Sequence, residues 1–410
     1  MSPQETRLND PQRPMAMQGI RVIDAATFIA APFAGTLLGE FGAEVLKVEL
    51  PGIGDPCRRL GTASDAGDSF SWLTEARNKK SLTLDLRKAE GAAIFKQLVA
   101  ESDVVCENFQ TGTLESWGLG WEDLKAINPR LVMLRVTGYG QTGPYSGRPC
   151  FGRIANAFSG LSYLAGEPDG PPMTPGSATL ADYGAGLFGA LGVLLALRAR
   201  DITGEGQVVD VALYESMFRL LDELVPAYGA KKIIRRRMGA GTATVVPHSH
   251  YPTSDGRWVA IACTTDKIFA RLTAAMERPE LSAPGAFERM EDRLAHRKEV
   301  DDAVAAWTRQ LPLAQVIAAC DRAQVPCGPV YAIDEIFEDP HYRQRGNLLT
   351  VPDERVGELT MPNVVPRLCG TPGAVNSLGP KLGEHTDSIL AAMLDMTPGQ
   401  LAELKSARVI

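Results

Sequence analysis

A single carboxylate stands out among the residues that could carry chemistry: Asp182, in the segment GSATLADYGAG at 176–186. It precedes a long apolar run, and its neighbours are mostly small. Aspartate is favoured at a helix N-terminus because its oxygens accept unpaired amide protons and the helix dipole stabilises its charge. The segment therefore predicts either a simple helix cap or a carboxylate that a bulky ligand can approach closely.

Other kinds of chemistry find less support in the sequence. The seven cysteines show no C-x-x-C spacing and the five histidines complete no zinc motif, so we expect no metal site. An odd number of unpaired cysteines is typical of reduced thiols, which favours a cytoplasmic location. The net charge of −7 disfavours nucleic acid as a partner. The longest charge-free apolar run, 183–197, is short for a membrane helix, so we expect no membrane association.

The N-terminal third alternates strands and helices in a way that would position such a carboxylate. The pattern predicts strands at 19–26, 43–50, 81–86, 103–108 and 131–137, and helices at 33–41, 89–100 and 121–127. This alternation predicts an α/β domain that is Rossmann-like in its layers. No G-x-G-x-x-G follows the first strand, so a dinucleotide is not the expected ligand.

The rest of the chain predicts a second domain and a returning tail. Helices are expected at 154–163, 182–198 and 214–228, with a strand at 206–213. The composition then changes to a basic stretch followed by a Gly/Thr-rich one. A chain of 410 residues is too long for one simple core. We therefore expect a large domain over 1–228, a smaller α+β domain over 229–330, and a segment 331–410 that returns to the large domain.

Nine segments, taken in order, resemble the class III CoA-transferases, the family of formyl-CoA:oxalate and carnitine CoA-transferases. They are AAPFAGTLLGEFGAEVLKVE (30–49), GDPCR (54–58), NKKSLTLDL (78–86), VCENF (105–109), TGYGQTGPY (137–145), PGSATLADYGAG (175–186), TGEGQVVDVALYES (203–216), VPCGPV (325–330) and LGEHTDSIL (382–390). The resemblance extends from Gly19 to Ile410.

The resemblance implies a covalent mechanism centred on Asp182. Its carboxylate would attack the thioester of a donor acyl-CoA, and the released thiolate would convert the resulting anhydride into an aspartyl-CoA thioester. An acceptor acid would then take the coenzyme A. The family uses CoA thioesters as substrates with no permanently bound cofactor, and it forms a homodimer of interlocked rings. The loop 239–242 is either a lid or a flexible linker.

The resemblance also transfers a CoA site to particular residues of the large domain. The first strand–helix turn maps to Thr27, Phe28, Ile29 and Ala30, where Thr27 and Ile29 replace the family's His and Gln. Asn108 and Phe109 would lie near the pantetheine arm, and Tyr139 would line the site. Arg58 and Arg87 are candidate contacts for the CoA phosphates.

A racemase of α-methylacyl-CoA type is the alternative within the same superfamily. That reaction needs two bases on opposite faces of the α-carbon, and the second is a histidine upstream of the aspartate. Phe151 stands at that position, in the segment CFGRIAN at 150–156, which favours the transferase. Arg153 lies in an otherwise apolar segment, so we expect it to be buried and to need an anion. That anion would be either the distal carboxylate of a dicarboxylic acid or a protein carboxylate. The local pattern looks like the branch that uses succinyl-CoA with malate, citramalate, itaconate, mesaconate or glutarate.

Overall fold

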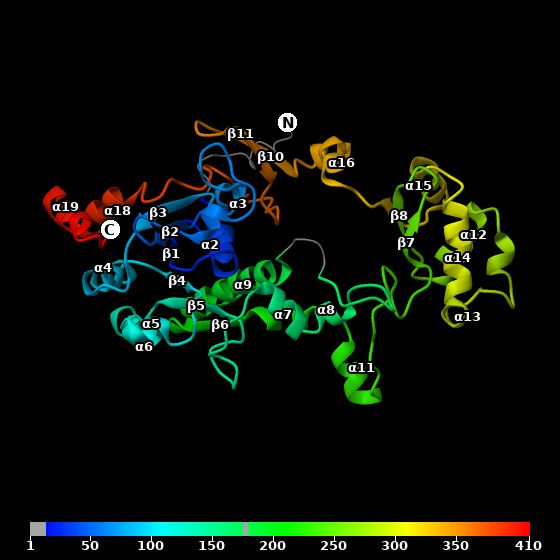
Figure 1. Ribbon diagram of the computed structural model, residues 1–410, viewed down its shortest axis with the longest axis horizontal. Helices are drawn as coiled ribbons and strands as arrows, with labels where there is room; N and C mark the ends of the chain where they lie inside the picture. The colour runs from blue at the N-terminus through cyan, green and yellow to red at the C-terminus, as the bar shows by residue number, and fades with distance from the viewer. Residues whose placement is uncertain (1–13, 175–178) are drawn as a thin grey trace. The chain divides into compact units, whose positions relative to one another are not determined.

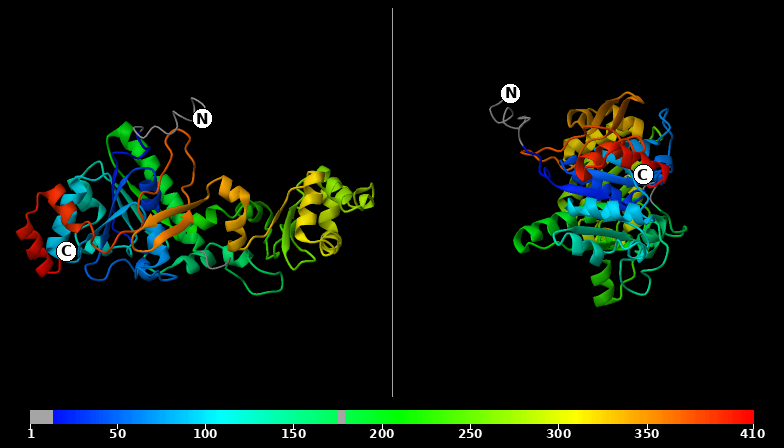
Figure 2. Two further views of the ribbon diagram at one scale, coloured as in Figure 1. Left: turned by 90° about the horizontal axis from the view of Figure 1, so that it is seen from above. Right: turned by 90° about the vertical axis from the view of Figure 1, so that its left-hand side faces the viewer.

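The computed structural model describes residues 14–174 and 179–410, so part of the Asp182 segment, 175–178, lies outside the described residues. Its contacts divide the chain into two compact units (Figures 1 and 2). Unit 1 comprises Met1–Gly160, Ser177–Asp222 and Tyr342–Ile410, and unit 2 comprises Leu161–Gly176 and Glu223–His341. Unit 1 is thus assembled from three separate stretches of the chain.

Unit 1 is built on a six-stranded sheet with the order β3-β2-β1-β4-β5-β6, in which all neighbours are parallel. The strands are β1 (Arg21–Asp24), β2 (Glu44–Glu49), β3 (Lys79–Thr83), β4 (Val104–Glu107), β5 (Val132–Thr137) and β6 (Val208–Ala212). The expected α/β fold is confirmed. The strand order reverses between β1 and β4, and doubly wound sheets bind ligands outside the carboxyl ends of the strands at this point.

Helices cover both faces of this sheet. On one face α2 (Ala30–Glu40) and α9 (Leu180–Thr203) pack against each other, α2 over β1, β2, β4 and β5 and α9 over β5 and β6. On the other face α4 (Ala89–Ala100), α6 (Trp121–Ile127), α18 (Thr386–Leu394) and α19 (Pro398–Ser406) share one apolar core with the strands. Shorter elements complete this part of the chain: η1 (Pro56–Arg59), α3 (Phe70–Glu75), α5 (Thr113–Ser116) and α7 (Gly152–Phe158).

Helix α9 is longer than the sequence predicts, because it begins at Leu180 and continues through charged residues to Thr203. Its length and composition would suffice to cross a membrane. Half of its most apolar window is nevertheless buried inside the fold, against α2, β5, β6 and α10. We therefore interpret α9 as a core helix of unit 1.

The single helix expected over 214–228 is wrong. The structure has α10 (Leu213–Arg219) and α11 (Leu224–Lys231), separated by a turn in which Asp222 adopts φ = 49°. The physical reason is Pro226, which lacks an amide donor and clashes with the preceding turn inside a helix but is tolerated near a helix start. The break places α10 in unit 1 and α11 in unit 2.

The C-terminal stretch of unit 1 contains α17 (Pro340–Gln344), which begins at the boundary, a hairpin of β10 (Leu348–Asp353) and β11 (Gly357–Pro362), and the helices α18 and α19. Trp72 Nε1 donates to the carbonyl of Pro380 at 2.9 Å, and the Thr83 amide donates to Thr386 Oγ1 at 2.9 Å. Val409 and Ile410 are buried in the core that α4 shares with the sheet. Contacts between distant parts of the chain therefore complete unit 1.

Unit 2 contains a three-stranded antiparallel sheet of β7 (His248–Pro252), β8 (Trp258–Ala262) and β9 (Cys327–Pro329). One core joins this sheet to the helices α12 (Asp266–Ala275), α14 (Arg297–Thr308) and α15 (Leu313–Ala323). The remaining elements are α8 (Leu161–Leu164), η2 (Pro279–Ser282), α13 (Met290–Ala295) and α16 (Ile333–Glu338).

Candidate functional site

Asp182 lies in the first turn of α9, three residues after the N-cap, which is Thr179. The carboxylate is therefore near the positive end of the helix dipole, which favours its charged form. Its half-buried position has the opposite effect, since burial raises the pKa of Asp182 to about 6. No cationic side chain contributes to that pKa. The site thus holds a carboxylate that is partly withdrawn from water and that has no counter-ion among the described residues.

The small residues around Asp182 accommodate the protein itself. A Cβ placed on Gly184 would stand 2.4 Å from Met217 Cε, and one on Gly186 would stand 2.6 Å from the carbonyl oxygen of Ala30. These glycines let α9 approach α10 and α2 closely. The interpretation that they leave room for a bulky ligand is therefore wrong for Gly184 and Gly186.

The segment before and at the start of α7 forms one wall of the site. Gly152 lies against the Asp182 carboxylate, because a Cβ there would stand 2.0 Å from Oδ2. Cys150 lies nearby, and burial together with the Asp182 charge raises the pKa of its thiol. Phe151 is 69% exposed and meets Phe28 edge-on, with ring centroids 6.0 Å apart. This aromatic pair connects the Asp182 wall with the first strand–helix turn.

Tyr139 belongs to an aromatic cluster beside this wall. Its ring centroid lies 5.1 Å from that of Phe158 and 5.8 Å from that of Tyr145, and Phe158 also packs on Tyr214 at 5.0 Å. The Tyr139 hydroxyl lowers the pKa of the Cys150 thiol by hydrogen bonding, against the larger effect of burial. Tyr139 therefore packs in the cluster and interacts with Cys150, while its role in lining the site stays a prediction.

A cavity of about 280 Å³ opens at the carboxyl ends of β1, β2 and β3. Three of the residues expected to bind CoA line it, namely Thr27, Arg87 and Phe109, and Trp117 closes one side. The cavity lies where the strand order reverses, the position at which sheets of this kind bind their ligands. Arg58 does not line it, nor do the side chains of Ile29 and Ala30, which are 5% and 4% exposed.

The first strand–helix turn, which borders this cavity, is held by backbone contacts to two side chains. Asn108 accepts from the Thr27 amide at 2.8 Å and donates to the Thr27 carbonyl at 2.7 Å. Asp55 accepts from the amide of Phe28, a residue with φ = 61° in the left-handed region. Such a conformation in a bulky residue costs energy and persists where the surroundings determine it.

A buried ionic network beneath this turn is the part of the site that the sequence reasoning missed. Lys47 Nζ lies 2.8 Å from Asp55 Oδ2 and 3.5 Å from Asp24 Oδ1, and Lys79 Nζ lies 2.9 Å from Asp24 Oδ2. Lys47 and Lys79 hold the pKa of Asp24 below its usual range despite burial. The sequence did contain a signal for this network, namely charged residues inside strands whose other residues are typical of buried positions.

The three arginines expected at the site differ in their surroundings. Arg58 is buried; its Nε and Nη2 donate to Glu49 at 2.7 and 2.8 Å, its Nη1 pairs with Asp68, and it stacks on Trp72. Its donors are therefore engaged by the protein, which argues against a role in binding phosphate. Arg87 is exposed and pairs with Asp85 at 2.8 Å.

Arg153 is exposed, so the expectation of a buried arginine that must find an anion is wrong. It is the second residue of α7, directly after Gly152, and its position on the surface of this short helix removes the need for a counter-ion. It makes no hydrogen bond or ion pair with the part of the chain that the structure describes. A free guanidinium therefore lies one residue from the glycine that contacts Asp182.

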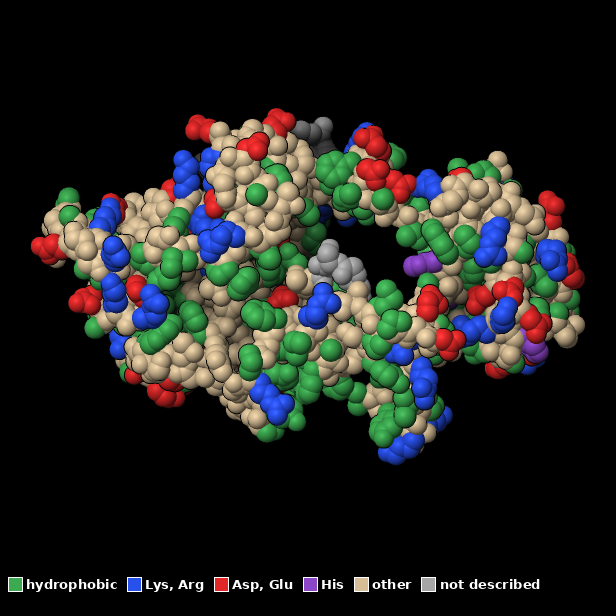
Figure 3. Space-filling model, viewed as in Figure 1, with side chains coloured by type: hydrophobic (Ala, Val, Ile, Leu, Met, Phe, Trp, Pro, Cys, Tyr) green, Lys and Arg blue, Asp and Glu red, His purple; other side chains and the backbone are tan. Residues whose placement is uncertain are grey.

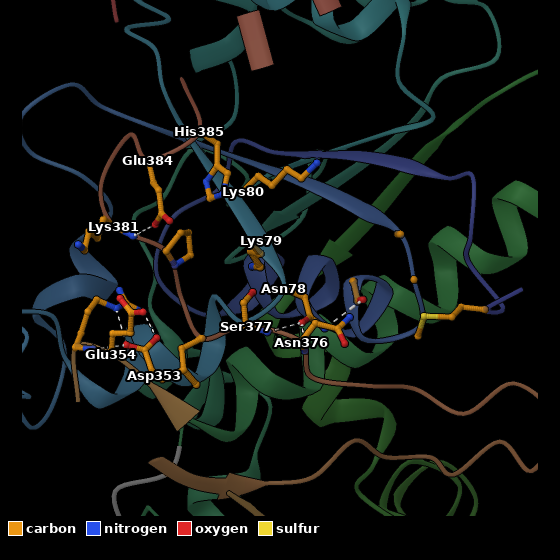
Figure 4. A pocket seen from close by; sticks show the side chains of 17 residues that line it. Asn78, Lys79, Lys80, Asp353, Glu354, Asn376, Ser377, Lys381, Glu384 and His385 are labelled. Atoms are coloured by element: carbon orange, nitrogen blue, oxygen red, sulfur yellow. Dashed lines mark hydrogen bonds and ion pairs between the residues drawn. The ribbon is translucent and has the colours of Figure 1, made fainter. Parts of the chain in front are cut away.

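A larger cavity, of about 590 Å³, opens at the amino ends of β2 and β3 under the C-terminal segment (Figure 4). Its polar lining mixes both charges, among them Lys80, Lys381, Glu354 and Glu384. His385 also lines it, and burial lowers the pKa of this imidazole. None of the residues expected to bind CoA or to react lines this cavity, so we place the candidate site at the opposite end of the strands.

The glycine-containing loop 239–242 belongs to unit 2. Gly239 donates to the carbonyl of Gly166 at 2.9 Å, and Gly241 donates to that of Met238 at 3.0 Å. Ala240 and Thr242 line a cavity of about 390 Å³ together with His248 and His250. Figure 3 shows basic and apolar side chains gathered over α11, just before this loop. Within the described ranges, His, Cys, Asp and Glu side chains form no cluster of three or more that could hold a metal ion.

Comparison with known proteins gives a consistent result. Residues 17–386 match the profile of the family described as "CoA-transferase family III". The succinyl-CoA–L-malate CoA-transferase beta subunit of Chloroflexus aurantiacus is 56% identical, over 97% of this chain and 98% of that one. The succinyl-CoA–D-citramalate CoA-transferase of the same organism is 44% identical, over 98% of this chain and 100% of that one. A solved CAIB/BAIF family protein from Brucella suis is 32% identical with a TM-score of 0.82, covering 93% and 100% of the two chains.

Proposed function

The chain belongs to CoA-transferase family III and is an enzyme of the CoA-transferase type, and from this premise we propose that it transfers coenzyme A from succinyl-CoA to a dicarboxylic acid. The proposed acceptors are malate, citramalate or a related acid, because relatives that match almost the whole chain carry those names. Itaconate, mesaconate and glutarate complete the set to be compared.

The proposed reaction proceeds through Asp182. Its carboxylate oxygen attacks the thioester carbon, the C–S bond breaks, and CoA leaves as a thiolate. The thiolate then attacks the Asp182 carbonyl of the mixed anhydride, which releases succinate and leaves an aspartyl-CoA thioester. The acceptor carboxylate attacks this thioester, and the same two exchanges in reverse yield the new acyl-CoA and the free aspartate. The overall reaction replaces one CoA thioester and one free carboxylate by another such pair of similar energy, so it needs neither a metal nor a nucleotide.

The observation that carries this proposal is the environment of Asp182. A carboxylate with a pKa of about 6 and no counter-ion in 14–174 or 179–410 is a stronger nucleophile than an ordinary aspartate and is still mostly ionised at pH 7. Partial burial protects both acyl intermediates from water. The 280 Å³ cavity is too small for a whole CoA molecule, so we propose that it receives one part of the ligand beside Thr27 and Phe109.

We further propose that Arg153 contacts the distal carboxylate of the acceptor. An exposed guanidinium with no partner in the described chain is available for a bidentate contact with a carboxylate. Its position next to Gly152 puts it on the element that forms the wall beside Asp182.

The exposed face of α9 supports a proposal of dimerisation. Leu187, Leu191 and Leu195 are 56%, 50% and 62% exposed, and they recur along one side of the helix. Monomeric proteins rarely leave such an apolar stripe open to solvent. We propose a homodimer. The word "subunit" in the name of one relative suggests an alternative, in which a second, related chain covers this face of α9. Light scattering of the purified chain distinguishes the two assemblies, because a homodimer forms from this chain alone.

The decisive experiment is mass spectrometry of the enzyme incubated with succinyl-CoA and then treated with hydroxylamine or borohydride. We expect a modification confined to Asp182, absent from Asp182→Ala and present in Asp201→Ala, which removes an exposed aspartate of the same helix. An unmodified Asp182 in active enzyme would overturn the covalent mechanism. Exchange of the α-proton in a branched acyl-CoA, without transfer, would favour the racemase.

A further inference from the structure

Gly152 packs its bare Cα against the reacting group of the candidate site. An ideal Cβ on this residue would stand 2.0 Å from Oδ2 of Asp182, 3.1 Å from Cγ and 3.6 Å from Oδ1. These three are the nearest atoms to that position, and all belong to Asp182. Both residues lie in unit 1.

Position 152 requires glycine because there is no space for a side chain. Glycine is often required because the backbone adopts a positive φ, as at Gly140 and Gly160 in the neighbouring segments. Gly152 is absent from the positive-φ residues and is helical, so alanine would fit its backbone conformation. What excludes a side chain is the Asp182 carboxylate.

The backbone around Gly152 has little freedom to retreat. Two residues earlier, Cys150 is pressed against Gly138 at the end of β5, where a Cβ on Gly138 would stand 2.1 Å from Cys150 Cβ. Helix α7, which begins at Gly152, also packs against α10. A side chain at position 152 would therefore displace the carboxylate.

We infer that Gly152 is a positioning residue for the transfer reaction. The inference rests on the proposed role of Asp182, and it adds how the two oxygens of the Asp182 carboxylate are oriented. Contact with the Gly152 Cα fixes Oδ2 against the wall of the site and leaves Oδ1, the oxygen farther from that wall, to form the bond with the thioester carbon. The C–S bond of succinyl-CoA breaks in the same step, and the thiolate carries away the electron pair.

The test compares Gly152→Ala with Gly147→Ala in the full-length enzyme. Gly147 lies five residues earlier, and a Cβ there would meet nothing within 4 Å. We expect Gly152→Ala to lower kcat by about 10- to 100-fold, since misplacement by about 1 Å has effects of this size. The KM for succinyl-CoA should stay within about threefold, and the acid limb of the pH profile should move to lower pH as the carboxylate becomes more hydrated. Gly147→Ala should match the wild type.

A double-mutant cycle guards against a variant that merely folds poorly. Replacing Asp182 by alanine removes the three atoms that lie nearest to the new Cβ. Gly152→Ala should therefore lower the melting temperature in the wild type but not in the Asp182→Ala background. An equal loss in both backgrounds, or wild-type kcat for Gly152→Ala, would overturn the inference. Hydroxylamine trapping of the wild type tests the proposed function separately, because Asp182 can be trapped there whether or not Gly152 positions it.

Discussion

The side-chain amide of Asn108 forms two hydrogen bonds with the backbone of Thr27, accepting from its amide at 2.8 Å and donating to its carbonyl at 2.7 Å. The two residues lie 81 positions apart, after β4 and β1, the strands between which the sheet order reverses. An amide side chain is well suited to this contact because it offers a donor and an acceptor side by side. The pair ties together the ends of β1 and β4 beside the 280 Å³ cavity that we propose receives part of the CoA ligand.

Asn108→Ala should therefore lower the free energy of unfolding by about 1–3 kcal/mol and raise the KM for the acyl-CoA, since Thr27 loses both partners. Asn128→Ala is the matched control, because Asn128 is also half-buried and bonds three backbone groups away from the site. It should lose similar stability in urea titration without a change in KM. An unchanged KM for Asn108→Ala would show that the Asn108–Thr27 hydrogen bonds do not contribute to acyl-CoA binding.

Activity should fall as the pH decreases through about 6, because protonation removes the nucleophilic form of Asp182. The measurement is kcat/KM for succinyl-CoA between pH 4.5 and 8, roughly spanning this pKa. The acceptor acids are ionised throughout most of this window, so the inflection reports on the enzyme. An inflection near 4 would mean that Asp182 is fully hydrated in solution.

Asp182→Asn should make the protein more stable while abolishing transfer. The pKa of Asp182 rises from 3.8 to about 6 on folding, so the folded state binds the proton more tightly and stability falls as the pH rises through this window. Above it, the charge costs up to about 3 kcal/mol. Asparagine removes that cost, so the gain should be present at pH 7.5 and vanish below about pH 4 in thermal denaturation. Asp201→Asn, at an exposed position, should show neither effect.

Arg58→Ala should destabilise the protein by about 3–5 kcal/mol, because it leaves the buried Glu49 carboxylate without its partner. Arg59→Ala is the natural comparison, since Arg59 is exposed and, within the described ranges, bonds the Ile53 carbonyl alone. It should change the stability by less than about 0.5 kcal/mol. If Arg58→Ala instead kept its stability and lost affinity for CoA, the phosphate-binding role suggested by family resemblance would be restored.

Arg153→Ala should raise the KM for dicarboxylate acceptors by about 10-fold or more and leave monocarboxylates nearly unchanged. The monocarboxylate serves as an internal control for general damage to the site. A similar rise in KM with both kinds of acid would mean that Arg153 supports the structure of α7 and does not recognise the acceptor.

Periodicity along the chain was sufficient to predict the sheet unit. Helices α4 and α6 begin and end at the predicted residues, because their boundaries depend on local apolar spacing. Helix α2 starts at Ala30, three residues before the predicted start at residue 33, since Ile29 is buried at its N-cap. Where the stretch Tyr342–Ile410 packs depends on contacts across hundreds of residues, so local patterns could suggest its return but not its partners.

In the candidate site, too, local patterns predicted some features, and features that depend on three-dimensional packing were missed. Asp182 was identifiable from its segment, whereas Thr27 and Asn108 were implied only by the family resemblance. The contact between Gly152 and Asp182 was not, because it depends on how α7 meets α9 in three dimensions. The exposure of Arg153 could not be predicted either, since an apolar neighbourhood in the sequence does not fix which side of a short helix faces water.

The three-stretch construction of unit 1 has a consequence for how the protein is made. During synthesis β1 to β6 leave the ribosome first, but α18 and α19, which cover one face of that sheet, follow more than 170 residues later. Until then, the apolar residues of β3 and α4 that contact α18 lack their cover. A nascent chain in this state is prone to aggregation and a natural client for a chaperone. Its solubility should therefore depend on the rate at which unit 2 is translated.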